Sequence, residues 1–108
     1  EETDSTKTFY WRSGYPITTY LVSIAIGKYD TWTDSYSSQD GSKSMNVDYY
    51  SYPTYTEKAK TDWKNTDDMI DYFSKTFGEY TFINEKYGMA MFGWRSGAMD
   101  HQTNKSMG

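Results

Sequence analysis

The sequence predicts an α+β fold: a mixed, mostly antiparallel sheet of four to five strands, with two consecutive helices on one face. Three observations support this. Short β-branched or alternating apolar segments occur both early and late in the chain. The part between them has apolar residues three and four positions apart, which is the helical period. The 108 residues are enough for one domain and too few for two.

The first half of the chain predicts three strands after a polar, flexible segment at residues 1–8. Residues 19–27 are apolar at both alternating positions, which is typical of a central strand covered on both faces. Residues 28–37 combine helically spaced aromatics with many threonines and serines, and the threonines favour a strand. Residues 45–50 alternate apolar and polar, and the Asp40-Gly41 pair before them predicts a hairpin turn.

Two helices follow Pro53, which ends the third strand. Residues 54–65 predict the first helix, since apolar residues recur every four positions at Tyr55, Ala59 and Trp63. In the second, Thr66 is the expected N-cap and Gly78 the terminating residue. Its expected apolar stripe is Met69, Ile70, Phe73 and Phe77.

The last quarter of the chain predicts a loop and two more strands. Residues 79–85 form the loop, and the apolar segment at residues 87–94 is the fourth strand. Residues 95–97, with the sequence Arg-Ser-Gly, predict a tight turn, and residues 98–103 the fifth strand. No repeat or linker divides the chain, so residues 9–108 are expected to be a single domain.

The core is expected to be aromatic and rich in methionine. The chain has 12 tyrosines, 4 tryptophans, 5 phenylalanines and 6 methionines, whereas leucine, isoleucine and valine are scarce. Each aromatic side chain buries roughly 150–250 Å², which is enough to replace the missing aliphatic residues. The small net charge also argues against disorder.

Composition excludes several classes of function. A net charge of −4 without basic clusters makes nucleic acid an unexpected partner. The longest apolar segment is far shorter than the roughly 20 residues of a membrane helix, so no membrane partner is expected. There is no cysteine, which removes disulfides, thiolate metal sites and cysteine nucleophiles. No signal peptide is expected, and nothing in the sequence assigns a compartment.

The sequence offers few residues for metal or nucleophilic catalysis. A catalytic zinc usually has three protein ligands, and the chain holds one histidine, His101. Ser96 lies close to that histidine in sequence, but no nucleophile-elbow pattern surrounds it. Pairs of carboxylates remain open, because 15 acidic residues allow many combinations and no spacing selects one.

The segment Gly97-Ala98-Met99-Asp100-His101 resembles the Gly-x-Met-Glu-Asn/His exopeptidase motif of the aminopeptidase N-like zinc metallopeptidases, the gluzincin aminopeptidases. Two earlier segments add to the resemblance. Residues 20–27 are similar to the strand that begins the family's catalytic domain. Residues 68–80 are similar to its helix and Phe-Gly-x-Tyr-Pro-Phe loop, with Thr81 in place of the proline. The resemblance extends from about Phe9 to the end of the chain.

The resemblance implies the N-terminal lobe of a thermolysin-like peptidase catalytic domain, a fragment that binds the substrate's N-terminus. Asp100 would hold the peptide ammonium, and Gly97, Ala98 and Met99 would present backbone groups to the peptide. Asp100 is one methylene shorter than the family's glutamate, which withdraws the carboxylate by about 1.5 Å. The expected partners are a peptide N-terminus and the remainder of the catalytic domain.

The resemblance also implies a zinc ion in the parent enzyme, held by a His-Glu-x-x-His helix and a later glutamate. This chain contains neither of these, so we expect it to hold no catalytic residue, bind no cofactor itself and be inactive alone. An alternative function is an aromatic-rich module that binds carbohydrate or peptide through Trp11, Trp32, Trp63 or Trp94. A third is a structural domain without a ligand.

Overall fold

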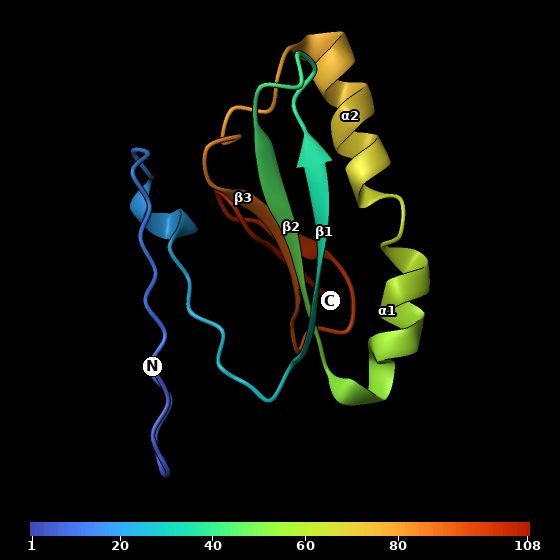
Figure 1. The fold of residues 1–108 in the computed structure, drawn as a ribbon. Coiled ribbons are helices and arrows are strands. Elements are labelled where there is room, and N and C mark those ends of the chain that lie inside the picture. The colour runs from blue at the N-terminus through green and yellow to red at the C-terminus, as the bar shows by residue number, and fades with distance from the viewer.

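The structure, a computed structural model, describes all 108 residues as one five-stranded sheet with two helices packed on one of its faces (Figure 1). The strands lie in the order β1-β2-β3-β5-β4. This arrangement confirms the predicted α+β class and the placement of both helices on the same face. No helix has the length and apolar character needed to cross a bilayer.

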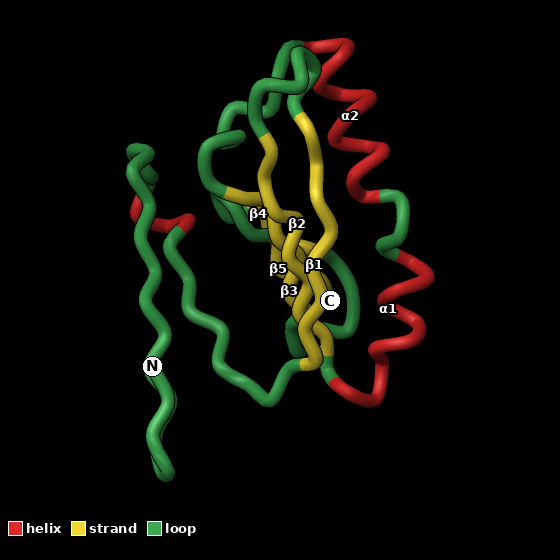
Figure 2. Tube along the Cα trace, viewed as in Figure 1, coloured by secondary structure: helices red, strands yellow, loops and turns green.

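The strands lie side by side (Figure 2), and the sheet is mixed. The longest pairing is the antiparallel β1–β2 hairpin, in which eight residues of each strand pair, and β4 also runs antiparallel to β5. β3 lies parallel to both β2 and β5. The strands are β1 (Asp30–Ser37), β2 (Ser44–Ser51), β3 (Lys86–Met91), β4 (Ala98–Asp100) and β5 (Lys105–Met107).

The hairpin turn lies where the sequence predicts it. Gly41 has φ +73°, a left-handed conformation that glycine adopts without steric cost. The turn is closed by the Ser38 N–H, which donates to the Lys43 carbonyl at 2.9 Å. Asp40 accepts from the backbone N–H of Ser42 at 2.9 Å, a local bond typical of aspartate in turns.

The predicted helices are present with shifted starts. A short 3-10 turn, η2 (Pro53–Tyr55), leads into α1 (Thr56–Asp62), and α2 (Thr66–Phe77) follows after three residues. Thr66 is the first residue of α2 rather than its cap, and its hydroxyl donates to the Trp63 carbonyl at 2.7 Å. Gly78, with φ +105°, terminates α2 as predicted.

The predicted apolar stripe of α2 is wrong in three of its four members. Ile70 is buried, but Met69, Phe73 and Phe77 are 52%, 56% and 79% exposed. The buried residues of α2 recur every fourth position, and they are Thr66, Ile70 and Ser74. The two small polar residues allow close approach to the sheet, so the larger apolar side chains point outward.

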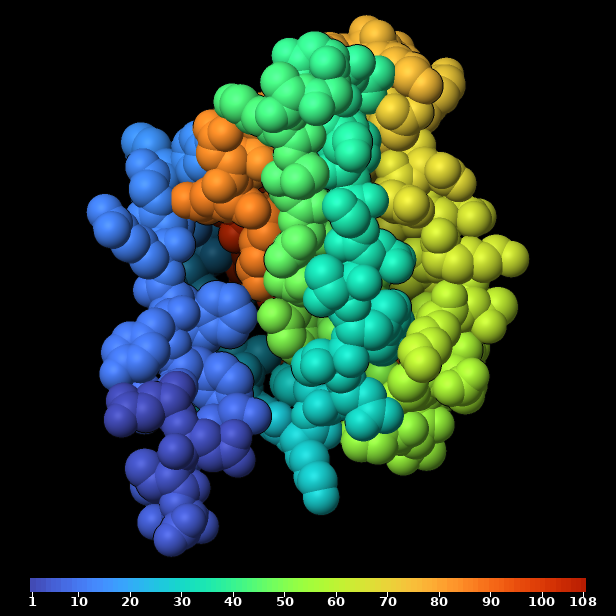
Figure 3. Space-filling model, viewed as in Figure 1, coloured from blue at the N-terminus to red at the C-terminus, as the bar shows by residue number.

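The predicted central strand at residues 19–27 is also wrong. The structure has only a 3-10 turn there, η1 (Thr19–Leu21), and no strand pairing after it. Val22, Ile24 and Ile26 are 62%, 82% and 92% exposed. β-Branched residues favour an extended backbone, and Val22 does have an extended backbone. A strand also needs an adjacent strand with which to form hydrogen bonds, and this segment has none. The initial residues lie to one side of the sheet (Figure 3).

β5 was not predicted, and its insertion changes the order of the strands. It has three residues, of which Lys105 and Ser106 are polar, so it shows no apolar alternation. It nevertheless lies between β3 and β4, and the Phe92 N–H continues the parallel pairing by donating to the Met107 carbonyl at 2.7 Å. As a result β4, rather than β3, is the last strand on this side of the sheet.

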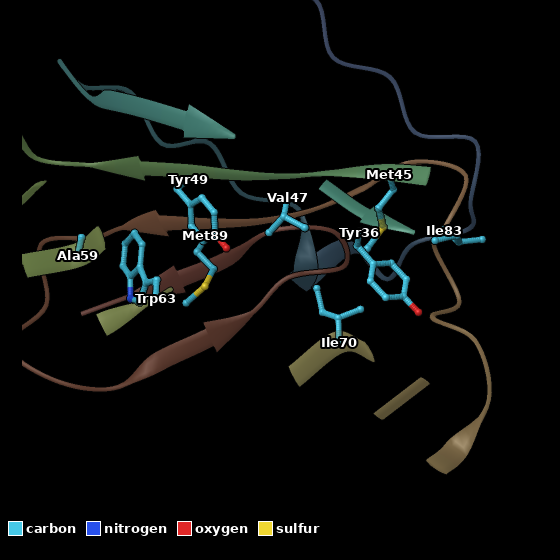
Figure 4. Close-up of a cluster of buried hydrophobic side chains, with 9 residues drawn as sticks. All are labelled: Tyr36, Met45, Val47, Tyr49, Ala59, Trp63, Ile70, Ile83 and Met89. Carbon is cyan, nitrogen blue, oxygen red and sulfur yellow. The ribbon is translucent and has the colours of Figure 1, made fainter. Parts of the chain in front are cut away.

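The core lies between the sheet and the helices (Figure 4) and is aromatic and methionine-rich, as predicted. At its centre Trp32, Tyr49 and Trp63 form a stack with ring centroids 5.1–6.0 Å apart. Burial raises the pKa of the Tyr49 phenol to about 12. The buried cluster is Tyr36, Met45, Val47, Tyr49, Ala59, Trp63, Ile70, Ile83 and Met89.

Candidate functional site

β4 carries the residues that the sequence singles out, and a tight turn introduces it. Gly97 has φ +95°, and an added Cβ would meet no atom within 4 Å. The glycine is therefore required by backbone conformation and not by crowding within the chain. Its carbonyl accepts from the Gly108 N–H at 2.8 Å, which fixes the start of the β4–β5 pairing. The strand ends at Asp100, earlier than predicted.

β4 is an edge strand with an unpaired side. Gly97 and Gly108 face each other as a hydrogen-bonded pair. Because hydrogen-bonded and non-hydrogen-bonded pairs alternate along antiparallel strands, the next hydrogen-bonded pair is Met99 and Ser106. The N–H and C=O groups of Ala98 and Asp100 accordingly point away from β5. An edge of this kind offers hydrogen bonds to an added extended chain.

The side chains of β4 divide between the two faces of the sheet. Met99 is half-buried on one face, and Ala98 and Asp100 lie on the other. The Asp100 side chain is 85% exposed. This position leaves its carboxylate accessible beside the open edge.

Lys105 lies directly opposite Asp100 on β5. Its Nζ is 3.6 Å from Asp100 Oδ1 and donates to the His101 carbonyl at 2.9 Å. It also lies over the Tyr87 ring, 5.8 Å from the centroid. Burial, and secondarily the negative charge of Asp100, raise the pKa of the Tyr87 phenol. The Asp100–Lys105 ion pair and the Tyr87 ring beside it form a cluster that sequence reasoning missed.

His101, which follows β4, forms hydrogen bonds with Leu21 and Ser23 of the N-terminal segment. Its Nδ1 lies 3.0 Å from the Leu21 carbonyl oxygen, and its Nε2 lies 3.3 Å from Ser23 Oγ. Because a carbonyl only accepts, Nδ1 donates to the Leu21 carbonyl, and Nε2 shares the second hydrogen bond with the serine hydroxyl, which can donate or accept. The imidazole is therefore engaged on both sides, and neither partner is Ser96.

The residues of this chain do not fit a zinc site. No group of three histidine, cysteine, aspartate or glutamate side chains converges anywhere in the structure. The single histidine already uses both ring nitrogens. A tetrahedral zinc needs three or four such donors around one point.

The four tryptophans have different surroundings. Trp32 and Trp63 belong to the core stack, as the sequence predicts for a sheet residue and a helix residue. Trp94 is half exposed and packs edge-on against Phe92. Trp11 is 69% exposed, and the Lys86 ammonium lies 4.5 Å from its ring centroid.

A cavity of about 490 Å³ lies beside Trp11, and sequence reasoning did not find it. It combines residues from the N-terminal segment, β2, β3 and the two loops that follow α2 and β4. Only the order of these segments in space brings them together, so no local signal marks the cavity. Its lining is Trp11, Arg12, Ser13, Asn46, Asp48, Asn84, Glu85, Lys86 and Thr103.

Comparison with known proteins gives a likeness of fold. No protein-family model matches the chain, and no curated protein is significantly similar in sequence. Among the solved structures that match is the crystal structure of Legionella pneumophila aminopeptidase A in complex with aspartic acid, with a TM-score of 0.63. The match covers 75% of this chain at 16% identity. This chain resembles only 9% of that one, so the shared fold is a small part of a larger aminopeptidase.

Proposed function

We propose that this chain is part of a zinc-dependent aminopeptidase and that its β4 edge binds the free N-terminus of a peptide. The observation that carries the proposal is that the Gly97-to-Asp100 motif forms an exposed edge strand. A fold resembling part of a solved aminopeptidase supports the same reading. The likeness of fold is a second observation, since it compares backbone structure and not the motif.

The geometry suits a peptide that joins the sheet as a further strand. Ala98 and Asp100 would exchange backbone hydrogen bonds with it, because their N–H and C=O groups face away from β5. The Asp100 carboxylate would then accept from the peptide ammonium, a charge-assisted bond stronger than a neutral one. Only a chain terminus carries an ammonium at that point, so the site would select terminal residues.

Hydrolysis itself would need groups that this chain does not hold. In the whole enzyme a zinc ion would polarise the scissile carbonyl and activate a water. No group of three histidine, cysteine, aspartate or glutamate side chains converges in this chain, so the proposal assigns the ligands of that ion to the remainder of the enzyme. The role proposed here is to bind and orient the peptide, with no catalytic residue of its own.

The remainder of the catalytic domain is the proposed partner of the exposed apolar surfaces. One such surface is the outward face of α2, with Met69, Phe73 and Phe77. The other is the unpaired segment with Val22, Ile24 and Ile26. Exposed apolar groups of this size are typical of surfaces that another unit covers.

The test is peptide binding by isothermal titration, with alanyl-alanine amide and its N-acetylated form as ligands. We expect the free amine to bind and the acetylated peptide to bind at least about fivefold more weakly, because acetylation removes the charge. Asp100→Asn should reduce affinity for the free amine by a similar factor. Asp62→Asn, an exposed aspartate distant in sequence from β4, is the matched control and should leave affinity unchanged.

Equal affinity for the free and acetylated peptides would contradict the proposal. So would an Asp100→Asn variant that binds as the unmodified chain does. Because Asp100 is 85% exposed, its substitution is expected to leave the fold intact, which a thermal unfolding curve verifies.

A second candidate function is carbohydrate binding at the Trp11 cavity. Its lining combines one exposed aromatic ring with amide, hydroxyl and charged groups, the mixture that a sugar face and its hydroxyls require. Oligosaccharides should then shift the tryptophan fluorescence of the chain, and Trp11→Ala should abolish the shift. No shift with any oligosaccharide would remove this candidate.

A further inference from the structure

The side chains around the Trp11 cavity differ in whether their hydrogen-bonding groups are already used. We propose that the groups left free make this cavity a site for acidic sugars, namely oligosaccharides of uronic acids, whose carboxylate binds Arg12. The inference rests on the second candidate function, carbohydrate binding, and adds a ligand class to it. It does not depend on the peptide site on β4.

The two carboxylates of the cavity lining are already engaged by neighbouring groups. Asp48 accepts from the Thr33 hydroxyl at 2.9 Å, and its other oxygen lies 3.4 Å from the Lys86 ammonium. Glu85 accepts from the backbone N–H of Gly14 at 2.7 Å. Both carboxylates therefore have partners within the protein, and much of their acceptor capacity is used.

Three polar side chains of the lining make no hydrogen bond and no ion pair within the chain. They are Arg12 of the N-terminal segment, Asn46 of β2 and Thr103 of the loop after β4. A guanidinium has five N–H donors and no acceptor, whereas an amide has both kinds of group and a hydroxyl can act as either. The free groups are thus mostly donors, which suits a ligand rich in acceptor oxygens.

Arg12 is the cation of the lining that has no anionic partner. Lys86, the other cation, lies beside Asp48, whereas Arg12 is exposed and forms no ion pair. A planar guanidinium can bind both oxygens of a carboxylate at once, which adds geometric specificity to the charge. Because the lining holds two cations and two carboxylates, the preference depends on the free group and not on net charge.

Trp11 favours a sugar over a small inorganic anion. Its ring is 69% exposed, and an aromatic ring can pack against the apolar face of a pyranose. The Lys86 ammonium, 4.5 Å from the ring centroid, helps to hold the ring in place. Arg12 lines the same cavity, so a uronic acid can offer a ring face to Trp11 and a carboxylate to Arg12 within one sugar unit.

The test compares trigalacturonic acid with its fully methyl-esterified form, which has the same rings and no charge. Isothermal titration of the unmodified chain should give about a fivefold lower Kd for the acid, and added salt should reduce the difference. In Arg12→Gln the ratio of the two Kd values should fall to about one, whereas Arg12→Lys should retain part of the preference. Arg95→Gln, an exposed arginine outside the cavity lining, is the matched control and should leave the ratio unchanged.

The outcomes separate this inference from the functions proposed above. If the acid and the ester bind with equal affinity, the preference for acidic sugars is overturned and carbohydrate binding stands. A preference that survives in Arg12→Gln overturns the role of Arg12. If neither compound binds, the acidic-sugar site is overturned, and the fluorescence test with other oligosaccharides decides the carbohydrate candidate. Peptide binding at β4 stands or falls separately, because residues 97–100 do not line the cavity.

Discussion

Gly97 is the residue whose substitution should most directly disturb the candidate site without touching its charges. Its φ of +95° lies where an L side chain is strained, so Gly97→Ala should lower the free energy of unfolding by about 1–3 kcal/mol. Gly93→Ala is the matched control, because Gly93 has no positive φ and no atom within 4 Å of an added Cβ. Chemical denaturation measures both, and equal effects would contradict the conformational argument.

Glu79 is a residue through which pH should control stability. Burial raises the pKa of its carboxyl, but hydrogen bonds, the largest effect among them from the Gln39 backbone, outweigh this and hold the pKa below its ordinary value. The donors are the Gln39 N–H at 2.7 Å, the Tyr36 hydroxyl at 2.9 Å and the Tyr80 N–H at 3.0 Å. A carboxyl whose pKa is lower in the folded state stabilises the fold at pH values above its ordinary pKa. This contribution to the free energy of unfolding is lost as the pH falls through the folded-state pKa.

Glu79→Gln should therefore destabilise the fold at neutral pH more than in acid. Because the side chain is exposed, the expected cost at pH 7 is only about 1 kcal/mol. Near about pH 3, which is below the ordinary glutamate pKa, the difference should be smaller than at pH 7, and it should vanish only below the lowered folded-state pKa. Urea unfolding at both pH values checks this, and a pH-independent difference would show that the carboxylate charge is irrelevant.

At the residue scale the sequence indicates the motif but not its surroundings. Gly97 and Asp100 can be identified as candidate site residues from their spacing in the sequence motif alone. The partners of the motif cannot, since Leu21 reaches His101 across 80 positions. Lys105 is only five residues from Asp100, yet their contact depends on β5, a strand too short and polar to show a pattern.

At the element scale, α2 offers a direct test of which face packs. Ile70 is 8% exposed and Phe77 is 79% exposed. Ile70→Ala should cost about 2–4 kcal/mol, because it leaves a cavity in the core. Phe77→Ala should change stability by less than about 0.5 kcal/mol. Thermal unfolding distinguishes them, and a large loss in Phe77→Ala would mean that the predicted apolar stripe faces the sheet after all.

The elements that sequence predicts correctly are those with strong local signals. The β1–β2 hairpin has a turn dipeptide followed by strict alternation in β2, and α2 has a terminating glycine. Residues 19–27 show the limit of such signals. They are apolar at both alternating positions, but this pattern does not say which part of the molecule covers these side chains. The same holds for α2, where the period predicts a helix while packing decides its orientation.

At the scale of the whole molecule, the arrangement of layers could be predicted, but the order of the strands could not. β5 enters the sheet between β3 and β4, which appear earlier in the sequence. β4 pairs only with β5, which leaves the open side on which the proposed function depends. Strand order of this kind depends on non-local pairing, which local pattern does not encode.

The isolated chain should not hydrolyse aminoacyl substrates, because the proposed role supplies binding without the groups that cut. We expect no release of a chromogenic amine from alanyl or aspartyl reporters, with zinc added or omitted. Turnover that is lost in Asp100→Asn would contradict this and assign the chemistry to the chain itself.

The central claim is that a peptide N-terminus docks on the open edge of β4. Amide chemical shifts of the isotope-labelled chain, recorded during titration with aspartyl-alanine amide, test it most directly. We expect the largest shifts at Ala98 and Asp100, and none along β1, which is the other edge of the sheet. Shifts confined to β1 or to the Trp11 cavity, with β4 unchanged, would contradict the account.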